Sequence, residues 1–242
     1  QAKLDVIIDF VPNHVAREYH STCKPRGVED LGENDNPQWA FSPLNNFYYM
    51  NEPFHPQFDT QDYHEEPARA TGNDCFTAQP SKNDWYETIK LNYGVFYQGG
   101  DEQQFDPIPS TWYKMLHILL FWSSKGVDGF RCDMAEMVPQ AFWSWVIPQV
   151  KEQYPNMLLI AEGCNPNWYR NYLSAGFDYL YDKVGMYDYL RGVTSKNWAV
   201  EGITLQWQAV DDIRDHMLYF LENHDEQRIA SGFFCGRGMC AE

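Results

Sequence analysis

The feature that most constrains the fold is a series of short apolar runs separated by helical patterns. Between Ser110 and Gly126, apolar residues recur at three- and four-residue spacing, which predicts an amphipathic helix with Ser110 as N-cap and Gly126 at its end. A second helix is predicted to begin near Pro139 and to contain Pro148. Strands that alternate with helices indicate parallel βαβ units and an α/β fold. The predicted strands cover residues 4–10, 127–132, 157–161, 177–181 and 217–221.

One long segment breaks this alternation. Residues 15–91 are rich in Pro, Asn, Asp and Gly and show no helical or strand periodicity. Because a structureless loop of this length is uncommon inside a compact domain, the segment is interpreted as an inserted subdomain. The chain is therefore predicted to divide into a strand and loop (residues 1–14), the insertion (residues 15–91) and the remainder of the sheet (residues 92–242).

Charge and composition exclude several classes of function. The chain has 18 Lys and Arg against 34 Asp and Glu, a net charge of −16, which argues against a nucleic-acid partner or an anionic membrane surface. No apolar run approaches the roughly 20 residues of a membrane-spanning helix, and no leader-like pattern follows Gln1. The 6 cysteines form no CxxC pair, so free thiols are expected rather than a zinc site.

Chemically competent side chains gather at the carboxyl ends of the predicted strands. In a parallel barrel these ends meet at one rim, where barrel enzymes keep their active sites. Arg131 and Asp133 are two residues apart and therefore face the same way on a strand. The spacings from Asp133 to Glu162 and from Glu162 to Asp225 match about one and two βα units. The residues in question are Asp9, Arg131, Asp133, Glu162, His224 and Asp225.

Carboxylates on a common rim suit the chemistry of acetals. One ionised carboxylate attacks the sugar carbon, and a protonated one donates to the leaving oxygen. Arg131 would keep Asp133 ionised, and the apolar run before Glu162 would raise the pKa of that carboxyl. Each residue alone is also explained as a helix cap or a rim salt bridge. Only the joint pattern favours catalysis.

Four segments resemble the signature regions of the α-amylase family of glycoside hydrolases. They occur in the family's order, and the insertion follows the first of them, where the family places its B domain. The resemblance implies a parallel (β/α)8 TIM-type barrel that is incomplete at both ends. This chain would hold roughly strands three to seven, as an internal portion of a longer enzyme. The four segments are Asp9–His14 (DFVPNH), Gly129–Asp133 (GFRCD), Ile160–Gly163 (IAEG) and Glu222–Asp225 (ENHD).

The resemblance also implies roles for individual residues. Asp133 would be the catalytic nucleophile, Glu162 the general acid and base, and Asp225 a ligand that helps distort the sugar. The implied mechanism is a double displacement with retention, which needs the two catalytic carboxyls about 5 Å apart. The other implied residues are the substrate-binding His14, Arg131 and His224 and the supporting Asp9 and Asn13.

Two positions depart from the family pattern. Many members carry a histidine four residues after the nucleophile, whose backbone carbonyl helps to bind calcium, whereas this chain has Met137. Glu136 stands where a lysine often contacts the acceptor sugar. Because acidic surfaces are usually only solvated, we assign no metal or cofactor. Calcium remains a possibility, with oxygen ligands available from Asn13, Asp30, Asp35, Asp59 and Asp62.

The expected function is therefore a glycoside hydrolase that cleaves α-glucosidic bonds in starch-like glucans or maltooligosaccharides. Two alternatives stay open: an α-glucan transglycosylase or branching enzyme with the same carboxylates, and a non-catalytic glucan-binding fragment. The expected partner is the glucan itself. The polymeric substrate suggests a secreted or periplasmic location, and the oligomeric state is not predicted.

Overall fold

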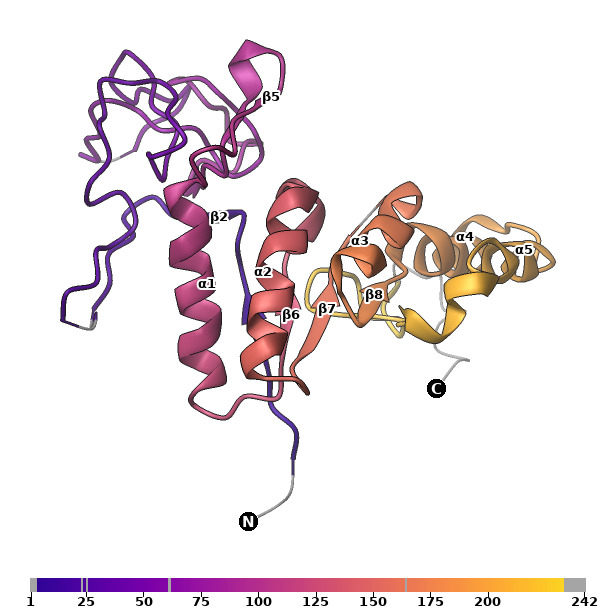
Figure 1. Ribbon diagram of the computed structural model, residues 1–242. Coiled ribbons are helices and arrows are strands. Elements are labelled where there is room, and N and C mark those ends of the chain that lie inside the picture. The colour runs from indigo at the N-terminus through magenta and orange to yellow at the C-terminus, as the bar shows by residue number, and fades with distance from the viewer. Residues whose placement is uncertain (1–3, 23, 25, 61, 164, 233–242) are drawn as a thin grey trace.

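A five-stranded parallel sheet forms the centre of the molecule (Figure 1). The computed structural model describes residues 4–22, 24, 26–60, 62–163 and 165–232. All neighbouring strands pair in parallel, which confirms the α/β prediction. In spatial order the strands are β1 (Ile7–Phe10), β6 (Gly129–Cys132), β7 (Leu158–Ala161), β8 (Tyr179–Tyr181) and β9 (Met217–Leu218).

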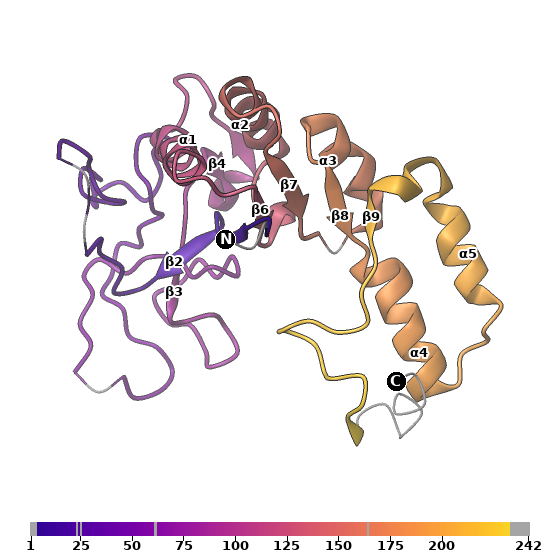
Figure 2. The same ribbon diagram turned by 90° about the horizontal axis from the view of Figure 1, so that it is seen from below.

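Helices follow the strands and cover one face of the sheet. Figure 2 shows α1 (Ser110–Ser123), α2 (Gln140–Gln153) and α3 (Tyr169–Ala175) side by side on that face. α4 (Asp188–Lys196) and α5 (Gly202–Ala209) lie between β8 and β9 in the sequence. Within the described segments, no helix combines the length and apolarity needed to cross a bilayer. Shorter helical turns cover Tyr97–Gly99, Ala135–Met137, Pro166–Trp168, Lys183–Tyr187 and Asp211–His216.

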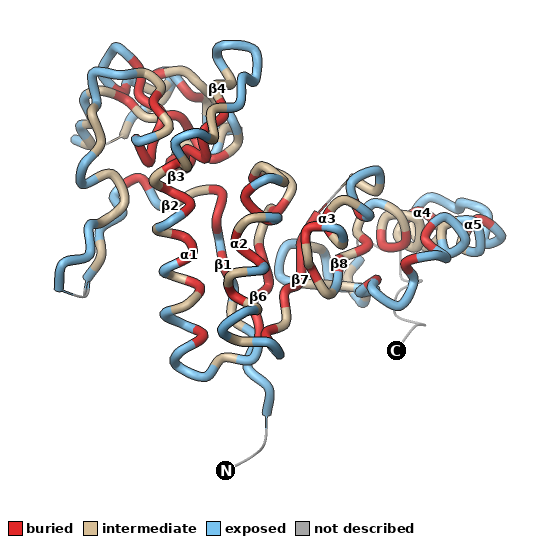
Figure 3. The backbone as a smooth tube through the Cα atoms, in the orientation of Figure 1, coloured by how far each residue is buried: buried red, intermediate tan, exposed pale blue. Residues whose placement is uncertain are grey.

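The main core lies between the sheet and these helices. Phe130, Leu159 and Leu180 point from three successive strands toward the helices, and each is almost fully buried. They pack with Phe142 and Trp143 of α2, and Figure 3 shows buried and exposed residues alternating along α1 and α2. Because strand side chains alternate, the residues between these core positions face the opposite side of the sheet.

Two sequence predictions about element ends are wrong. The last strand covers only Met217–Leu218 and not residues 217–221, because β8 offers it just Leu180 and Tyr181 as partners. Ser110 does not cap α1. It is the first helical residue after Pro109, and its Oγ accepts a hydrogen bond from Asn46 Nδ2 at 2.9 Å. The predicted stop is confirmed, since Gly126 has a φ of +86° just beyond the helix.

The irregular segment lies beyond the carboxyl end of β1, at the upper left of Figure 1. It is enclosed by an antiparallel pair of strands, β2 (His14–Ala16) and β3 (Thr88–Lys90). A second short pair, β4 (Val95–Phe96) and β5 (Glu102–Gln103), follows it. The insertion has an apolar cluster of its own, which consists of Tyr48, Met50, Phe54, Ala68, Ala70 and Ala78. The division at residues 15–91 stays a prediction.

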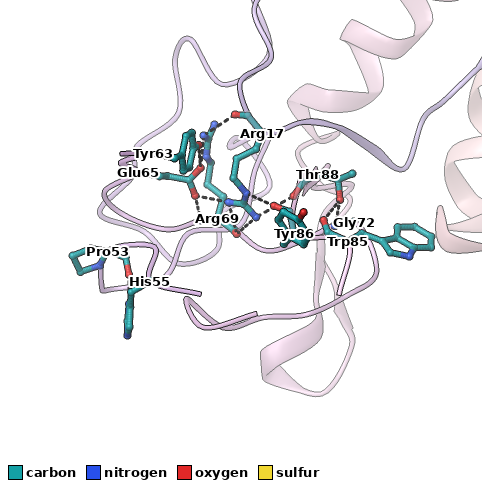
Figure 4. A network of polar contacts seen from close by, with 10 residues as sticks. All are labelled: Arg17, Pro53, His55, Tyr63, Glu65, Arg69, Gly72, Trp85, Tyr86 and Thr88. Atoms are coloured by element: carbon teal, nitrogen blue, oxygen red, sulfur yellow. Dashed lines mark hydrogen bonds and ion pairs between the residues drawn. The ribbon is translucent and has the colours of Figure 1, made fainter. Parts of the chain in front are cut away.

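A buried arginine cross-links the insertion (Figure 4). The guanidinium of Arg17 donates to Glu65 Oε1 at 2.6 Å, to the carbonyl of Tyr86 at 2.7 Å and to the carbonyl of Thr88 at 3.0 Å. Glu65 also accepts a 2.7 Å hydrogen bond from Arg69 Nη2. This network joins both ends of the insertion and stabilises a segment that has little regular secondary structure.

The thiols that the structure describes are unpaired. Cys75 is partly exposed and Cys132 is buried in the core, and both are free. The other cysteines for which free thiols were predicted lie outside the described residues; they are Cys23, Cys164, Cys235 and Cys240.

Candidate active site

Four of the predicted site residues meet at the carboxyl ends of β1, β6 and β7. Arg131 Nη1 donates to Asp9 Oδ1 at 3.0 Å and to Asp133 Oδ1 at 2.6 Å. Its Nη2 lies 2.7 Å from Glu162 Oε1, as an ion pair without hydrogen-bond alignment. The parallel register explains this meeting, because Asp9 is paired with Arg131, and Asp133 and Glu162 directly follow neighbouring strands. We call Asp9, Arg131, Asp133 and Glu162 the rim cluster.

The rim cluster holds one guanidinium against three carboxyl groups. The side chains of Glu162 and Asp133 are only 10% and 18% exposed, whereas that of Asp9 is 50% exposed. Burial raises the pKa of Glu162, and the nearby charge of Asp133 adds to this effect. The Met134 N–H and the charge of Arg131 oppose it without reversing it. The pKa of Glu162 is therefore raised, in the direction that the preceding apolar run predicts.

The arginine itself stays charged. Burial alone would lower the pKa of Arg131, but its hydrogen bond to Asp9 and its attraction to the three carboxylates raise that pKa instead. A permanent positive charge thus lies between Asp133 and Glu162. It offsets part of the repulsion that two buried carboxylates would otherwise experience.

A strained turn fixes the residues after Asp133. Met134 has a φ of +45°, which is unusual for a residue other than glycine. Its N–H donates to Glu162 Oε2 at 3.1 Å, and the N–H of Ala135 donates to the Glu162 carbonyl at 2.9 Å. The turn after β6 therefore holds Glu162 both by its side chain and by its backbone. The sequence offers no signal for this turn.

Asn13 and His14 lie where the insertion joins the sheet. Asn13 is 1% exposed, and its Nδ2 donates to the carbonyl of Gly72 at 2.7 Å. The His14 ring lies 5.5 Å from the ring of Trp85. Burial lowers the pKa of His14, the charge of Asp133 opposes this, and Lys90 lowers it further. His14 therefore favours the neutral form and lies within electrostatic reach of the rim cluster.

Asp225 and His224 lie in the loop that follows β9. Their side chains are 58% and 69% exposed, and they pair with each other at 3.2 Å. In the part of the chain that the structure describes, neither forms a hydrogen bond or an ion pair with the rim cluster. Their predicted roles stay predictions.

Sequence reasoning missed the neighbour of Asp225. Glu226 is 11% exposed and pairs with Lys183 at 2.9 Å and with Arg191 at 3.4 Å. Its Oε2 also accepts a 3.0 Å hydrogen bond from the Tyr187 hydroxyl. Burial opposes the charged form, but these partners lower the pKa of Glu226. Glu226 thus anchors the loop that carries Asp225 to the segment after β8.

A cavity of about 830 Å³ lies beside the turn after β6. Its walls come from the insertion and the strands that follow it, from residues 136–141 and from the segment after β7. Trp168 and Tyr172 supply aromatic surface, and Asp74, Asp101 and Glu136 supply acidic groups. Flat aromatic surfaces are suited to contact with sugar rings. The aromatic residues after β7 were not predicted as site residues.

Several of the possible calcium ligands have other partners. Asp35 accepts hydrogen bonds from the N–H groups of Asn46 and Phe47, at 2.7 and 3.0 Å. Asp30 accepts from the N–H of Ser21 at 2.8 Å. Among the described residues, no group of three or more His, Cys, Asp or Glu side chains is placed to hold a metal ion.

Comparison with solved structures finds α-amylases of similar fold. No protein-family model matches the chain. The α-amylase of Geobacillus thermoleovorans complexed with acarbose matches 97% of this chain and 43% of its own, with a TM-score of 0.59 and 19% identity. An Anoxybacillus α-amylase matches 98% of this chain and 42% of its own, with a TM-score of 0.56 and 19% identity. In fold the chain is similar to these α-amylases, in agreement with the resemblance that the signature segments predict.

The similar sequences are those of maltosyltransferases. The α-1,4-glucan:maltose-1-phosphate maltosyltransferase of Cereibacter sphaeroides is 30% identical over 136 residues, which are 53% of this chain and 21% of that protein. The same enzyme of Methylacidiphilum infernorum is 40% identical over 53 residues. The chain thus matches about a fifth or less of the length of these relatives.

Proposed function

We propose that this chain carries the catalytic carboxyls of an enzyme that cleaves α-glucosidic bonds in starch-like glucans or maltooligosaccharides. The observation that carries the proposal is the rim cluster, in which Asp133 and Glu162 contact the same guanidinium. The raised pKa of Glu162 supports its role as the acid. The names of the similar proteins, which act on an α-1,4-glucan or are α-amylases, support the substrate class.

The proposed reaction is a double displacement. Asp133 attacks the anomeric carbon while Glu162 gives its proton to the departing glycosidic oxygen, and a covalent glycosyl–Asp133 intermediate forms. Glu162 then takes a proton from water, and the resulting hydroxide releases the sugar with retention. The 2.6 Å hydrogen bond from Arg131 orients the attacking carboxylate.

We propose in addition that the five strands correspond to strands three to seven of an eight-stranded barrel. The rim cluster then lies at the carboxyl face of that barrel, which is where barrel enzymes work. His14, Asp225 and His224 would contact the sugar from the insertion and from the loop after β9.

Transfer to a sugar acceptor is the second candidate. The glycosyl–enzyme intermediate is the same, and a sugar hydroxyl replaces water in the second step. The similar maltosyltransferases favour this candidate. In either reaction, the cavity lined by Glu136, Trp168 and Tyr172 is the proposed place for the remaining sugar units.

The charge of that cavity bears on which leaving groups it accepts. The names of the relatives include maltose 1-phosphate. The lining residues that the structure describes include Asp101 and Glu136 but no lysine, arginine or histidine. Because phosphate binding needs basic groups or backbone N–H donors, we propose that a neutral saccharide rather than a phosphate occupies this cavity.

Trapping the intermediate tests the proposed chemistry. Fluoride leaves without protonation, so Glu162→Gln mixed with α-maltosyl fluoride should accumulate a covalent adduct on Asp133, visible by peptide mass spectrometry. Asp133→Asn is the matched control and should give no adduct. Absence of an adduct from Glu162→Gln, together with binding of maltooligosaccharide, would overturn catalysis in favour of a glucan-binding role.

The products that the wild-type chain forms distinguish hydrolysis from transfer. Incubation with excess maltotriose should yield no sugar longer than maltotriose if water is the acceptor. Products longer than maltotriose would establish transfer. Release of phosphate from maltose 1-phosphate would contradict the proposal of a neutral saccharide.

A further inference from the structure

Lys90 is a buried cation at the junction between the insertion and the sheet. Its side chain is 2% exposed. An ammonium has three hydrogen-bond donors, and Lys90 Nζ meets three oxygens: Asp74 Oδ1 at 2.6 Å, Asn13 Oδ1 at 2.7 Å and the carbonyl of Met137 at 3.3 Å. The three acceptors come from the insertion, the loop after β1 and the turn after β6.

These oxygens are of the kind that calcium binds. A carboxylate, a side-chain amide and a backbone carbonyl are typical ligands of this hard cation. The family resemblance assigns calcium to Asn13 and to the carbonyl at position 137. In this chain the Lys90 ammonium lies within hydrogen-bond distance of both, so a calcium ion would compete with a positive charge for the same oxygens. The residues present therefore do not fit the metal.

We propose that the Lys90 ammonium is a built-in replacement for calcium at this junction. It neutralises Asp74 and holds Asn13 against the turn that ends at Met137. The face of the Tyr97 ring, 5.4 Å from Nζ, adds a further favourable contact. Lys90 is a positioning residue, because it acts on His14 and on the turn after Asp133 through their neighbours.

The geometry around Nζ pairs the ammonium with one carboxylate, that of Asp74, at 2.6 Å. Three donors matched by three acceptors leave the ammonium no unsatisfied proton. The proposal does not depend on the proposed reaction, since it concerns the joint between the insertion and the sheet.

Thermal unfolding of the full 242-residue chain in excess calcium chloride and in EDTA tests the proposal. The wild-type midpoint should be the same in both, and calorimetric titration with calcium chloride should show no binding. Lys90→Met should lower the midpoint by about 5–10 °C, because it leaves the Asp74 carboxylate without its partner. Lys82→Met, which alters an exposed lysine of the insertion, should leave it unchanged.

The Lys90→Ala variant distinguishes two roles of Lys90, that of a replacement for calcium and that of a residue that only packs. The variant opens space beside Asn13, Asp74 and Met137, so calcium should restore part of its lost stability. A stabilising effect of calcium on the wild type would overturn the proposal. A Lys90→Ala chain that is destabilised and gains nothing from calcium would also overturn it, because Lys90 would then serve only to pack.

Discussion

Arg131 and Glu162 face each other across two neighbouring strands, with 2.7 Å between Nη2 and Oε1, although 31 residues separate them in the sequence. The pair brings a permanent cation against the carboxyl whose protonation is favoured by burial. In the proposed reaction, proton donation by Glu162 would leave its new negative charge next to the positive charge of Arg131. Such an arrangement would lower the cost of forming that charge.

Glu162→Gln should stabilise the fold at neutral pH. The folded-state pKa of Glu162 is raised by burial and by Asp133, so the ionised carboxyl costs stability as pH rises through that pKa. The neutral amide removes this cost. We expect a midpoint increase of about 2–4 °C at pH 7 for each kcal/mol relieved. The difference should vanish at a pH below the unfolded-state pKa, where wild-type Glu162 is protonated in both states. A lower midpoint at pH 7 would contradict this prediction.

Glu226→Gln should disturb the loop that carries Asp225 while leaving the main core intact. The change removes the charge that pairs with Lys183 and Arg191. We expect faster proteolytic cleavage within residues 222–230 and about a tenfold loss in kcat/KM on maltooligosaccharide, because misplacement of a binding group impairs the reacting geometry. Glu201→Gln, an exposed control, should behave as the wild type. Equal cleavage of both variants would count against the anchoring role.

The same anchor should depend on pH in a defined direction. The pKa of Glu226 is lowered in the folded state, so its contribution is present above the unfolded-state pKa and is lost as pH falls through the folded value. Wild-type cleavage in this loop should therefore approach that of Glu226→Gln in acid.

Arg17→Met should destabilise the chain more than any exposed arginine change. The Arg17 side chain is 5% exposed, and its guanidinium donates hydrogen bonds to Glu65 and to three backbone carbonyls. Methionine fills similar volume but leaves these acceptors unpaired, and we expect a loss of about 3 kcal/mol in the free energy of unfolding. Urea unfolding would measure it. Arg214→Met, at an exposed pair with Asp211, should cost under 1 kcal/mol.

Trp168→Ala should weaken binding of long substrates. Trp168 lines the cavity beside the rim and is 44% exposed. Loss of an aromatic contact worth about 0.5–1.5 kcal/mol should raise KM for long maltooligosaccharides by about 2- to 10-fold. KM for the shortest substrates and kcat should change little. Trp207→Ala, at a comparably exposed tryptophan on α5, serves as the control.

Local pattern predicted the sheet and the rim cluster well. Arg131 and Asp133 share a face because strand side chains alternate, and Glu162 joins them because β7 pairs in parallel with β6. These are consequences of spacing alone. The prediction was weaker where tertiary contact decides the outcome: the side chain of Ser110 bonds Asn46 instead of capping its helix.

Long-range partners lay beyond what the sequence could predict. Lys90 is 77 residues from Asn13 and 47 from Met137, and no periodicity links the three positions. The same holds for Glu226, whose role depends on how the loop after β9 returns to α4. Buried ion pairs of this kind are set by packing, which a one-dimensional pattern does not encode.

The pairing of β1 with β6 has a consequence for the order of folding. Asp9 and Arg131 are 122 residues apart, and the whole insertion lies between them. Closing so long a loop costs conformational entropy before the contact between the strands stabilises the fold. Such non-local pairings slow folding. β6, β7 and the helix between them can form earlier from nearby segments. We therefore expect the rim to be completed at a late step of folding, and detachment of β1 would remove Asp9 from Arg131 while the contacts between β6 and β7 remain.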